Sequence, residues 1–298
     1  MDKNIFDNYI NSDLALEGGR IAPCDFRHAK YGRREADGVT VERLSVTDRE
    51  GEVESGRPCG EYVTISSEAI KDTSCDGSAV AATVRDEFLS LFRTLTGREP
   101  DAASSVLVAG LGNRFMTPDA LGARCADKIV ATRHACDADS SHGIPSVSVV
   151  EPGVLSQTGI ESLTMIKGVL CDVSPDVIVV IDSMAAKKTS RLATTIQLAS
   201  CGIAPGHGIG NRRPVIDRAS TGHPVISVGS PTVVGSSTLI CDALEEAGIF
   251  TVTPELEAIL EGGRDFFVTL NDSDEVIERI SDIISCAVNS ALGTSYLR

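Results

Sequence analysis

Residues 106–124, VLVAGLGNRFMTPDALGAR, contain a complete strand-to-helix transition. Their first five residues form a short apolar run, which is typical of a strand buried in a parallel sheet. The glycines then allow a sharp turn, and Thr117 and Pro118 predict a helix start with Thr117 as the N-cap. Asp119 follows in the first helical turn, where the helix dipole favours an ionised carboxylate unless burial or a neighbouring acid opposes it.

Strands and helices alternate from this unit to the end of the chain. Further strands are expected at 146–150, 176–182 and 224–229, and further helices at 158–173, within 184–200, at 253–261 and at 272–292. Repeated units of this kind predict an α/β fold, with a twisted, mostly parallel sheet flanked by helices.

An antiparallel element is expected before this region. Residues 39–46 alternate between apolar and polar side chains, a Gly-rich turn region follows at 51–60, and a second strand pattern comes after it. These features predict a small N-terminal antiparallel β element at about 39–66. Residues 1–37 are polar and irregular, and apolar residues at spacings of three and four predict a helix at 79–96.

Composition restricts the class of protein. The chain has 298 residues, 42% of them hydrophobic, and a formal net charge of −15, which repels nucleic acid and anionic membranes. Its nine cysteines form no Cys-x-x-Cys pair and its five histidines are dispersed, a pattern typical of free thiols in a reducing cytoplasm without zinc. No signal peptide or membrane helix is evident. We expect a cytoplasmic protein with no metal, no membrane contact and no direct nucleic-acid partner.

Cofactor and nucleophile motifs are incomplete. Gly110 and Gly112 are followed by Asn113, Arg114 and Phe115 rather than by the third glycine of a dinucleotide-binding loop. The chain has neither the Gly-Lys-Ser/Thr of a P-loop nor the Gly-x-Ser-x-Gly of a serine hydrolase. No cofactor is therefore expected, and carboxylates become the candidates for chemistry.

Two aspartates are expected at the carboxyl edge of the parallel sheet, where sites form in such folds. Asp119 follows the strand at 106–110, and Asp182 ends the strand at 176–181 after five consecutive apolar residues. Burial of Asp182 would raise its pKa and keep it protonated. One ionised and one protonated carboxyl can activate water and protonate a leaving amine. A plain helix-start residue and an exposed strand end remain the alternatives.

Longer motifs resemble a known family. They are GLGNRFMTPDALGAR (110–124), ATRHAC (131–136), EPGVLSQTGIES (151–162), PDVIVVIDSMAAKKTSRLATTIQLASCGIAPGHGIGNRR (175–213) and HPVISVGSPTVV (223–234). From about residue 8 to residue 293, in order and with matching spacing, the chain resembles the germination protease of spore-forming bacteria.

The resemblance implies an endopeptidase that degrades small acid-soluble, DNA-coating spore proteins during germination, in the cytoplasm of the spore core. It implies an atypical aspartic-type peptidase whose two implicated aspartates lie in TPDALG and IDxxA motifs, which here contain Asp119 and Asp182. It also implies a core fold like that of the hydrogenase-maturation proteases and assembly as a homotetramer.

The resemblance further implies a zymogen. Members of the family remove a short propeptide themselves, at an acidic residue followed by Leu, Ile or Phe and then Ala. The tetrapeptide SDLA, which begins at Ser12, fits this pattern. Cleavage is therefore expected between Asp13 and Leu14, which leaves a propeptide of residues 1–13 and a single peptidase domain of residues 14–298.

Roles for individual groups follow as hypotheses. Asp119 is the candidate base for water and Asp182 the candidate acid for the leaving nitrogen, but a coupled pair titrates as a unit and the roles can be exchanged. The backbone N–H groups of Gly112 and Asn113 are candidates for stabilising the oxyanion. The alternative functions are a nickel-sensing hydrogenase-maturation-type endopeptidase and a non-enzymatic binding module. His207, in a long glycine-rich loop, has no assigned role.

Overall fold

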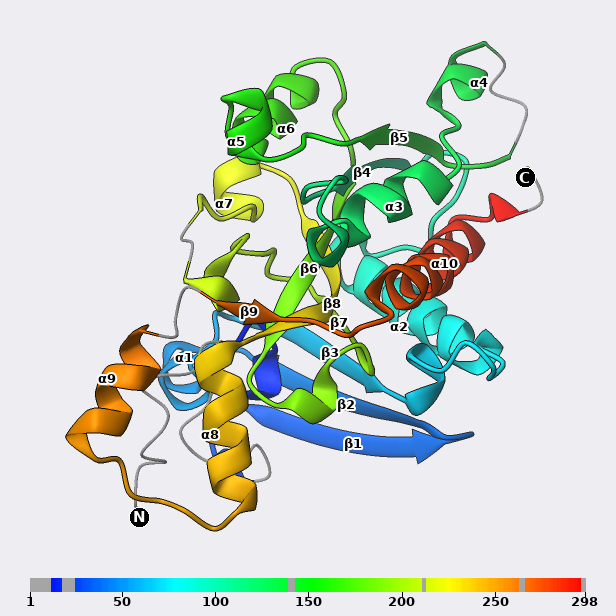
Figure 1. The fold of residues 1–298 in the computed structure, drawn as a ribbon. Helices are drawn as coiled ribbons and strands as arrows, with labels where there is room; N and C mark the ends of the chain where they lie inside the picture. Colours follow the sequence, from blue (N-terminus) through cyan, green and yellow to red (C-terminus); the bar gives the residue numbers. More distant parts are fainter. Residues whose placement is uncertain (1–11, 18–24, 139–142, 211–212, 263–265, 296–298) are drawn as a thin grey trace.

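The computed structural model describes residues 12–17, 25–138, 143–210, 213–262 and 266–295. One sheet of nine strands runs through this part of the chain and carries helices on both faces (Figure 1). Its strands are β1 (Lys30–Ala36), β2 (Val39–Val46), β3 (Gly60–Ser66), β4 (Ser105–Gly110), β5 (Ser146–Val150), β6 (Val177–Ala186), β7 (Thr195–Ala199), β8 (Val225–Gly235) and β9 (Phe267–Val268). Their order is β1-β2-β3-β7-β8-β6-β4-β5, and β9 pairs with the end of β8.

The sheet has a parallel half and an antiparallel half. Strands β5, β4, β6 and β8 are parallel neighbours, whereas β1, β2, β3, β7 and β8 are joined by antiparallel pairings. The α/β class is therefore confirmed. Across its whole width the sheet is mixed, because β7 connects the antiparallel element expected at about 39–66 to the parallel strands.

Helices flank both faces of the sheet. They are α1 (Arg49–Ser55), α2 (Ser78–Thr96), α3 (Leu121–Lys128), α4 (Arg133–Ala138), α5 (Leu155–Thr158), α6 (Ser162–Leu170), α7 (Arg218–Thr221), α8 (Ser236–Glu246), α9 (Pro254–Gly262) and α10 (Ser273–Ala291). Helix α10 contacts both α2 and α3, and the three enclose the largest core cluster with Val106, Val108 and Val179. The alternate residues Leu107 and Ile178 face the other side, where α6 packs.

The prediction of a helix within 184–200 is wrong. Strand β6 continues to Ala186, and β7 occupies the end of the segment. The Ala and Leu residues of this segment favour a helix, but Thr195 and Ile196 are β-branched and pair with β3. The neighbouring strands give the backbone of β7 hydrogen-bond partners on both sides, so tertiary structure overrides the local preference.

Smaller differences also have local causes. Part of the turn region expected at 51–60 is helix α1, which Asp48 caps by accepting a hydrogen bond from the backbone N–H of Gly51 at 2.8 Å. The helix expected at 158–173 is divided into α5 and α6 at Gly159, whose φ of 72° ends the first helix. Strand β1 lies in the region expected to be irregular, since an exposed edge strand has no apolar pattern.

Three glycines let the strand-to-helix unit fold closely onto itself. A Cβ on Gly110 would lie 2.1 Å from the carbonyl oxygen of Gly122, and one on Gly122 would lie 2.3 Å from that of Ile181. Gly112 has a φ of 96°, and a Cβ there would lie 1.9 Å from the carbonyl oxygen of Asp119. Helix α3 therefore approaches β4 and β6 at backbone distance, which brings Asp119 back over the edge of the sheet.

Candidate active site

Asp182 lies within β6 and not at its end. Strand β4 stops at Gly110, opposite Ile181, while β6 continues to Ala186 beside β8. Asp182 is therefore the first residue of β6 beyond the reach of β4, at the edge where the sequence places it. Its side chain is 5% exposed, and one carboxylate oxygen accepts a hydrogen bond from the backbone N–H of Ser183 at 2.9 Å.

Asp119 lies in the single 3-10 turn Thr117–Asp119, directly before α3. The backbone N–H of Asn113 donates to its carboxylate at 2.8 Å, which fixes the side chain against the glycine turn. The predicted N-cap role of Thr117 is wrong: Met116 occupies the cap position, and the hydroxyl of Thr117 donates to Asp274 on α10 at 2.9 Å.

The fold brings the two acids together. Two adjoining cavities, of about 220 Å³ and about 210 Å³, are both lined by Asp119 and Asp182, and they also share Met116 and Gly206. The larger one extends toward Glu161 at the start of α6. Both carboxyl groups are therefore accessible from either cavity.

Burial sets the charge state of the pair. It raises the pKa of Asp182 well above the ordinary value of 3.8, and the nearby charges of Asp119 and Asp13 raise it further. Burial also raises the pKa of Asp119, and the N–H of Asn113 opposes this shift. The helix dipole was expected to keep Asp119 ionised. Its effect on the pKa is smaller than that of burial, because Asp119 is half-buried and lies in only a short 3-10 turn. Asp182 is the more readily protonated member, as its apolar flank predicts.

Asp13, from the N-terminal segment, is seated beside this pair. Its backbone N–H donates to the carbonyl of Ala185 at 3.0 Å, and its carboxylate accepts from the N–H groups of Ala185 and Gly208 at 2.8 and 2.7 Å. A Cβ on Gly208 would lie 2.3 Å from the carboxylate oxygen, so only glycine leaves room for it. Asp13 lines the 210 Å³ cavity together with Asp119 and Asp182.

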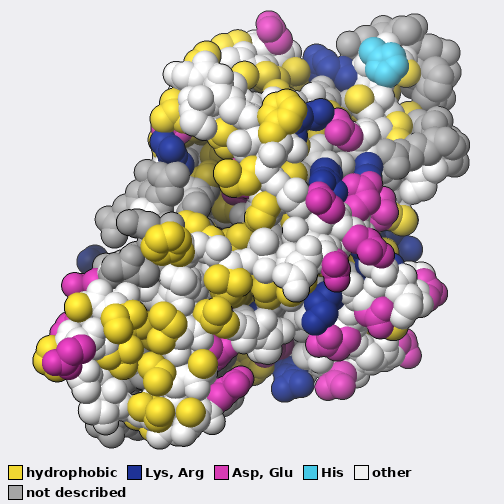
Figure 2. All heavy atoms as spheres, in the orientation of Figure 1, with side chains coloured by type: hydrophobic (Ala, Val, Ile, Leu, Met, Phe, Trp, Pro, Cys, Tyr) yellow, Lys and Arg dark blue, Asp and Glu magenta, His cyan; other side chains and the backbone are white. Residues whose placement is uncertain are grey.

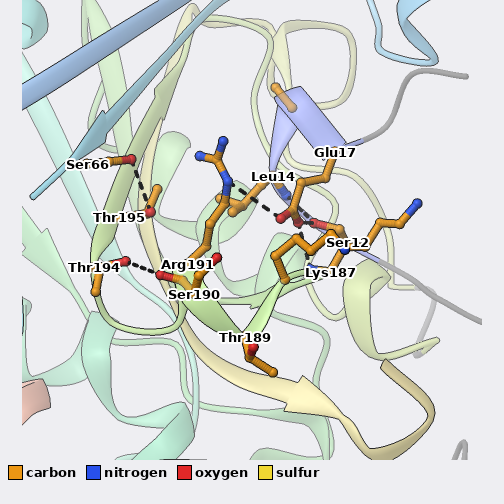
Figure 3. A network of polar contacts seen from close by, with 12 residues as sticks. Ser12, Leu14, Glu17, Ser66, Lys187, Thr189, Ser190, Arg191, Thr194 and Thr195 are labelled. Atoms are coloured by element: carbon orange, nitrogen blue, oxygen red, sulfur yellow. Dashed lines mark hydrogen bonds and ion pairs between the residues drawn. The ribbon is translucent and has the colours of Figure 1, made fainter. Parts of the chain in front are cut away.

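The residues after Asp13 hold the segment against the end of β6. Leu14 is fully buried, in a cluster that includes Met184 and Leu192. Figure 3 shows Glu17 beside Lys187 and Arg191, and its carboxylate accepts from the backbone N–H of Lys187 at 2.6 Å. The bond at which cleavage is expected therefore lies in a segment enclosed by the rest of the chain, and not on an exposed arm.

The other candidate groups have defined positions. The N–H of Asn113 is occupied by Asp119, and Gly112 lines the 220 Å³ cavity. His207 lines a third cavity, of about 310 Å³, together with Asp13 and Arg57. Among the described residues, no group of three His, Cys, Asp or Glu side chains is placed to hold a metal ion, and no helix is long and apolar enough to span a membrane.

Three residues that hold the segment were not candidates from the sequence. Arg57 follows α1, Gln197 lies on β7 and Gly208 lies in the 3-10 turn His207–Ile209, and all three contact residues 12–15. These contacts join residues that are 43 to 195 positions apart in the sequence, so no short local pattern predicts them. The glycine-rich loop around Gly208 was the one signal of a functional segment.

The raised pKa of Asp182 predicts a pH-dependent effect of Asp182→Asn on stability. An acid whose pKa is higher in the folded state loses stabilisation as the pH rises from about 4 toward that folded pKa, because the unfolded chain releases its proton earlier. The amide removes this penalty while keeping an acceptor for Ser183. Thermal unfolding is expected to show a melting temperature for the variant, relative to wild type, that rises by about 2 °C or more between pH 4 and pH 7.5. A difference that stays constant over this range would contradict the raised pKa.

Sequence comparisons with known proteins agree on one family. A family model described as germination protease matches residues 24–247. The chain is 35% identical to the germination protease of Caldanaerobacter subterraneus subsp. tengcongensis, over 95% of this chain and 94% of that protein. It is 33% identical to the germination protease of Clostridium perfringens, over 95% of each. A solved structure of a NiFe hydrogenase maturation protease, HycI from Thermococcus kodakarensis KOD1, shares 18% identity at a TM-score of 0.32, over 61% of this chain and 92% of that one.

Proposed function

Because the chain belongs to the germination protease family, and so to the peptidases, we propose that it is an endopeptidase that cuts small acid-soluble, DNA-coating spore proteins during germination. Asp119 and Asp182 carry the reaction, and the chain is made as a zymogen that processes itself. The observation that supports this most directly is the position of Asp13 in a cavity that both acids line.

The two carboxyl groups divide the work of hydrolysis. The carboxylate of Asp119 takes a proton from water as the water oxygen bonds to the carbonyl carbon of the peptide. Asp182, whose pKa burial raises, holds a proton and gives it to the leaving nitrogen as the carbon–nitrogen bond breaks. The proton gained and the proton lost balance, so a single transfer between the two acids restores the pair.

The seat of Asp13 supports cleavage after an acidic residue. Burial raises the pKa of Asp13, while the two backbone N–H groups that hold its carboxylate, and then the charges of Arg57 and His207, oppose this shift. The next side chain, Leu14, is packed in an apolar cluster. An acid followed by an aliphatic residue therefore fits the groove on chemical grounds.

The start of the active protein tests the self-processing proposal. Intact-mass measurement of the active protein is expected to show a chain that begins at Leu14 and lacks residues 1–13. Asp182→Asn, purified in the same way, is expected to keep its original N-terminus. An active wild-type protein that starts at another residue would contradict cleavage of the Asp13–Leu14 bond.

Gly208→Ala is expected to slow self-processing by about tenfold or more. The added methyl group would occupy the carboxylate seat, and hydrogen bonds to a charged acceptor contribute about 1.5–3 kcal/mol. The rate is measured by following the intact mass over time. Gly32→Ala, on the exposed strand β1 with open space around the glycine, is the matched control and is expected to process at the wild-type rate. Equal processing rates for both variants would show that the contact between Gly208 and the carboxylate of Asp13 is not needed for self-processing.

Exposed apolar side chains support the proposed homotetramer. Figure 2 shows hydrophobic side chains gathered over the region of α8 and α9. The exposed members in and around this region are Leu239, Ile249, Phe250, Ile259, Phe266, Phe267 and Val268. Apolar patches of this kind mark contacts with other chains, and another copy of this chain is the occupant that the family resemblance implies.

A further inference from the structure

Gln197 spans the bond between Asp13 and Leu14 with a single side chain. Its amide nitrogen Nε2 donates to the carbonyl oxygen of Asp13 at 3.2 Å, and its Oε1 accepts from the backbone N–H of Ala15 at 2.6 Å. The residue is 4% exposed and lies on β7, in the middle of the sheet. One carboxamide thus supplies the donor and the acceptor that a neighbouring strand would supply to an extended chain.

The other backbone groups of the segment are held in a similar way. Nη2 of Arg57 donates to the carbonyl oxygens of Ser12 and Leu14 at 3.1 and 2.6 Å. The carbonyl of Ala185 accepts from the N–H of Asp13 at 3.0 Å. On the side of the segment, these contacts reach only backbone atoms, which every peptide substrate possesses. They therefore fix the position of a chain along the groove whatever its side chains are.

We propose that Gln197 sets the register of the peptide and holds the carbonyl of the bond that is cut, in substrates as well as in the chain's own segment. This inference rests on the proposed function and adds a residue to it. The Nε2–H group donates to the carbonyl oxygen, which gains negative charge as water adds to the carbon, so the donor stabilises the transition state as well as the bound peptide. Oε1 holds the N–H two residues further along and prevents a shift by one residue.

The same contact is available to a substrate after processing. Once residues 1–13 leave, Nε2 loses the carbonyl of Asp13 and, among the described residues, keeps only a 4.0 Å contact to the sulfur of Met184. The backbone carbonyl of an incoming peptide restores the lost bond.

Peptides with single N-methyl groups test the proposal. The parent peptide extends the sequence of residues 12–17 on both sides, one version is methylated at the nitrogen that corresponds to Ala15, and a control is methylated one residue later. With wild-type protein, the first methyl group is expected to lower kcat/KM by about tenfold and the control to have little effect. With Gln197→Ala, the parent peptide is already about tenfold slower, and the first methyl group adds little. Gln197→Glu keeps the acceptor but not the donor, so kcat falls while the sensitivity to methylation remains.

Equal losses on methylation in wild type and Gln197→Ala would overturn the proposal. If the wild-type protein cuts no peptide, the proposed function fails, and the register is then tested in the intact chain by thermal unfolding. Ala15→Pro removes the N–H at the first position of a 3-10 turn, where proline is tolerated. The losses of stability from Ala15→Pro and Gln197→Ala are compared with the loss in the double variant. A double-variant loss smaller than the sum of the two supports a direct contact between these residues, and an additive loss overturns it.

Discussion

Asp182→Asn is expected to lower kcat for cleavage of a small acid-soluble spore protein by about a thousandfold, with the fold retained. The amide fits the same space and keeps an acceptor for Ser183, but it has no proton to give to the leaving nitrogen. Asp119→Asn is expected to cause a loss of similar size, because it removes the base that activates water. Steady-state kinetics measure the loss, and circular dichroism checks the fold.

Asp176→Asn is the matched control. Asp176 lies directly before β6, at the opposite end of the strand, where its carboxylate accepts from the backbone N–H of Ser105 at 2.9 Å. It makes the same replacement of a carboxyl group by an amide next to the same strand, so full activity is expected. Full activity in Asp182→Asn or Asp119→Asn would reject the two-carboxyl mechanism, and an equal loss in the control would show that any such replacement near β6 lowers activity.

Gly122→Ala is expected to lower the free energy of unfolding by about 3 kcal/mol. The new Cβ would lie 2.3 Å from the carbonyl oxygen of Ile181 and 2.5 Å from the backbone nitrogen of Leu111. Those two atoms form the 2.8 Å hydrogen bond that continues the pairing of β4 and β6. Backbone atoms cannot turn aside as a flexible side chain does, so α3 must move away from the sheet. Urea unfolding followed by circular dichroism measures the change.

Gly168→Ala is the control for this glycine. It lies on the exposed side of α6, with open space where the Cβ would be placed. Alanine favours a helix over glycine by about 0.8–1 kcal/mol, so the variant is expected to be as stable as wild type or more stable. A loss below about 1 kcal/mol for Gly122→Ala would show that α3 can shift at little cost and that the close approach is not needed.

The sequence predicts the parallel half of the fold better than the antiparallel half. Buried strands such as β4 and β6 are apolar runs whose pattern is local, and the long helices α2 and α10 carry a clear period. The edge strand β1 is exposed and charged, so its structure depends on its partner β2 rather than on its own composition. Strand β7 likewise forms because β3 and β8 lie on either side of it.

The acids of the candidate site follow from the sequence, but their surroundings do not. Asp119 follows β4, and Asp182 lies on β6 just beyond the end of β4, so a parallel sheet brings both to one edge. The raised pKa of Asp119 depends on burial in the assembled site, which a helix-dipole argument on one turn does not include. Gln197 and Gly208 contact residues 12–15, which lie far away in the sequence, and neither residue type predicts such a contact on its own.

The complete burial of Leu14 makes the proposed self-cleavage a one-way step. Hydrolysis turns the neutral Asp13–Leu14 amide into a carboxylate and an ammonium group, both of which prefer water to a protein interior. The new ammonium would be attached to a residue whose side chain is fully enclosed. The two new ends therefore separate instead of rejoining, and the part of the groove that holds Asp13 is freed by the charges that the reaction creates.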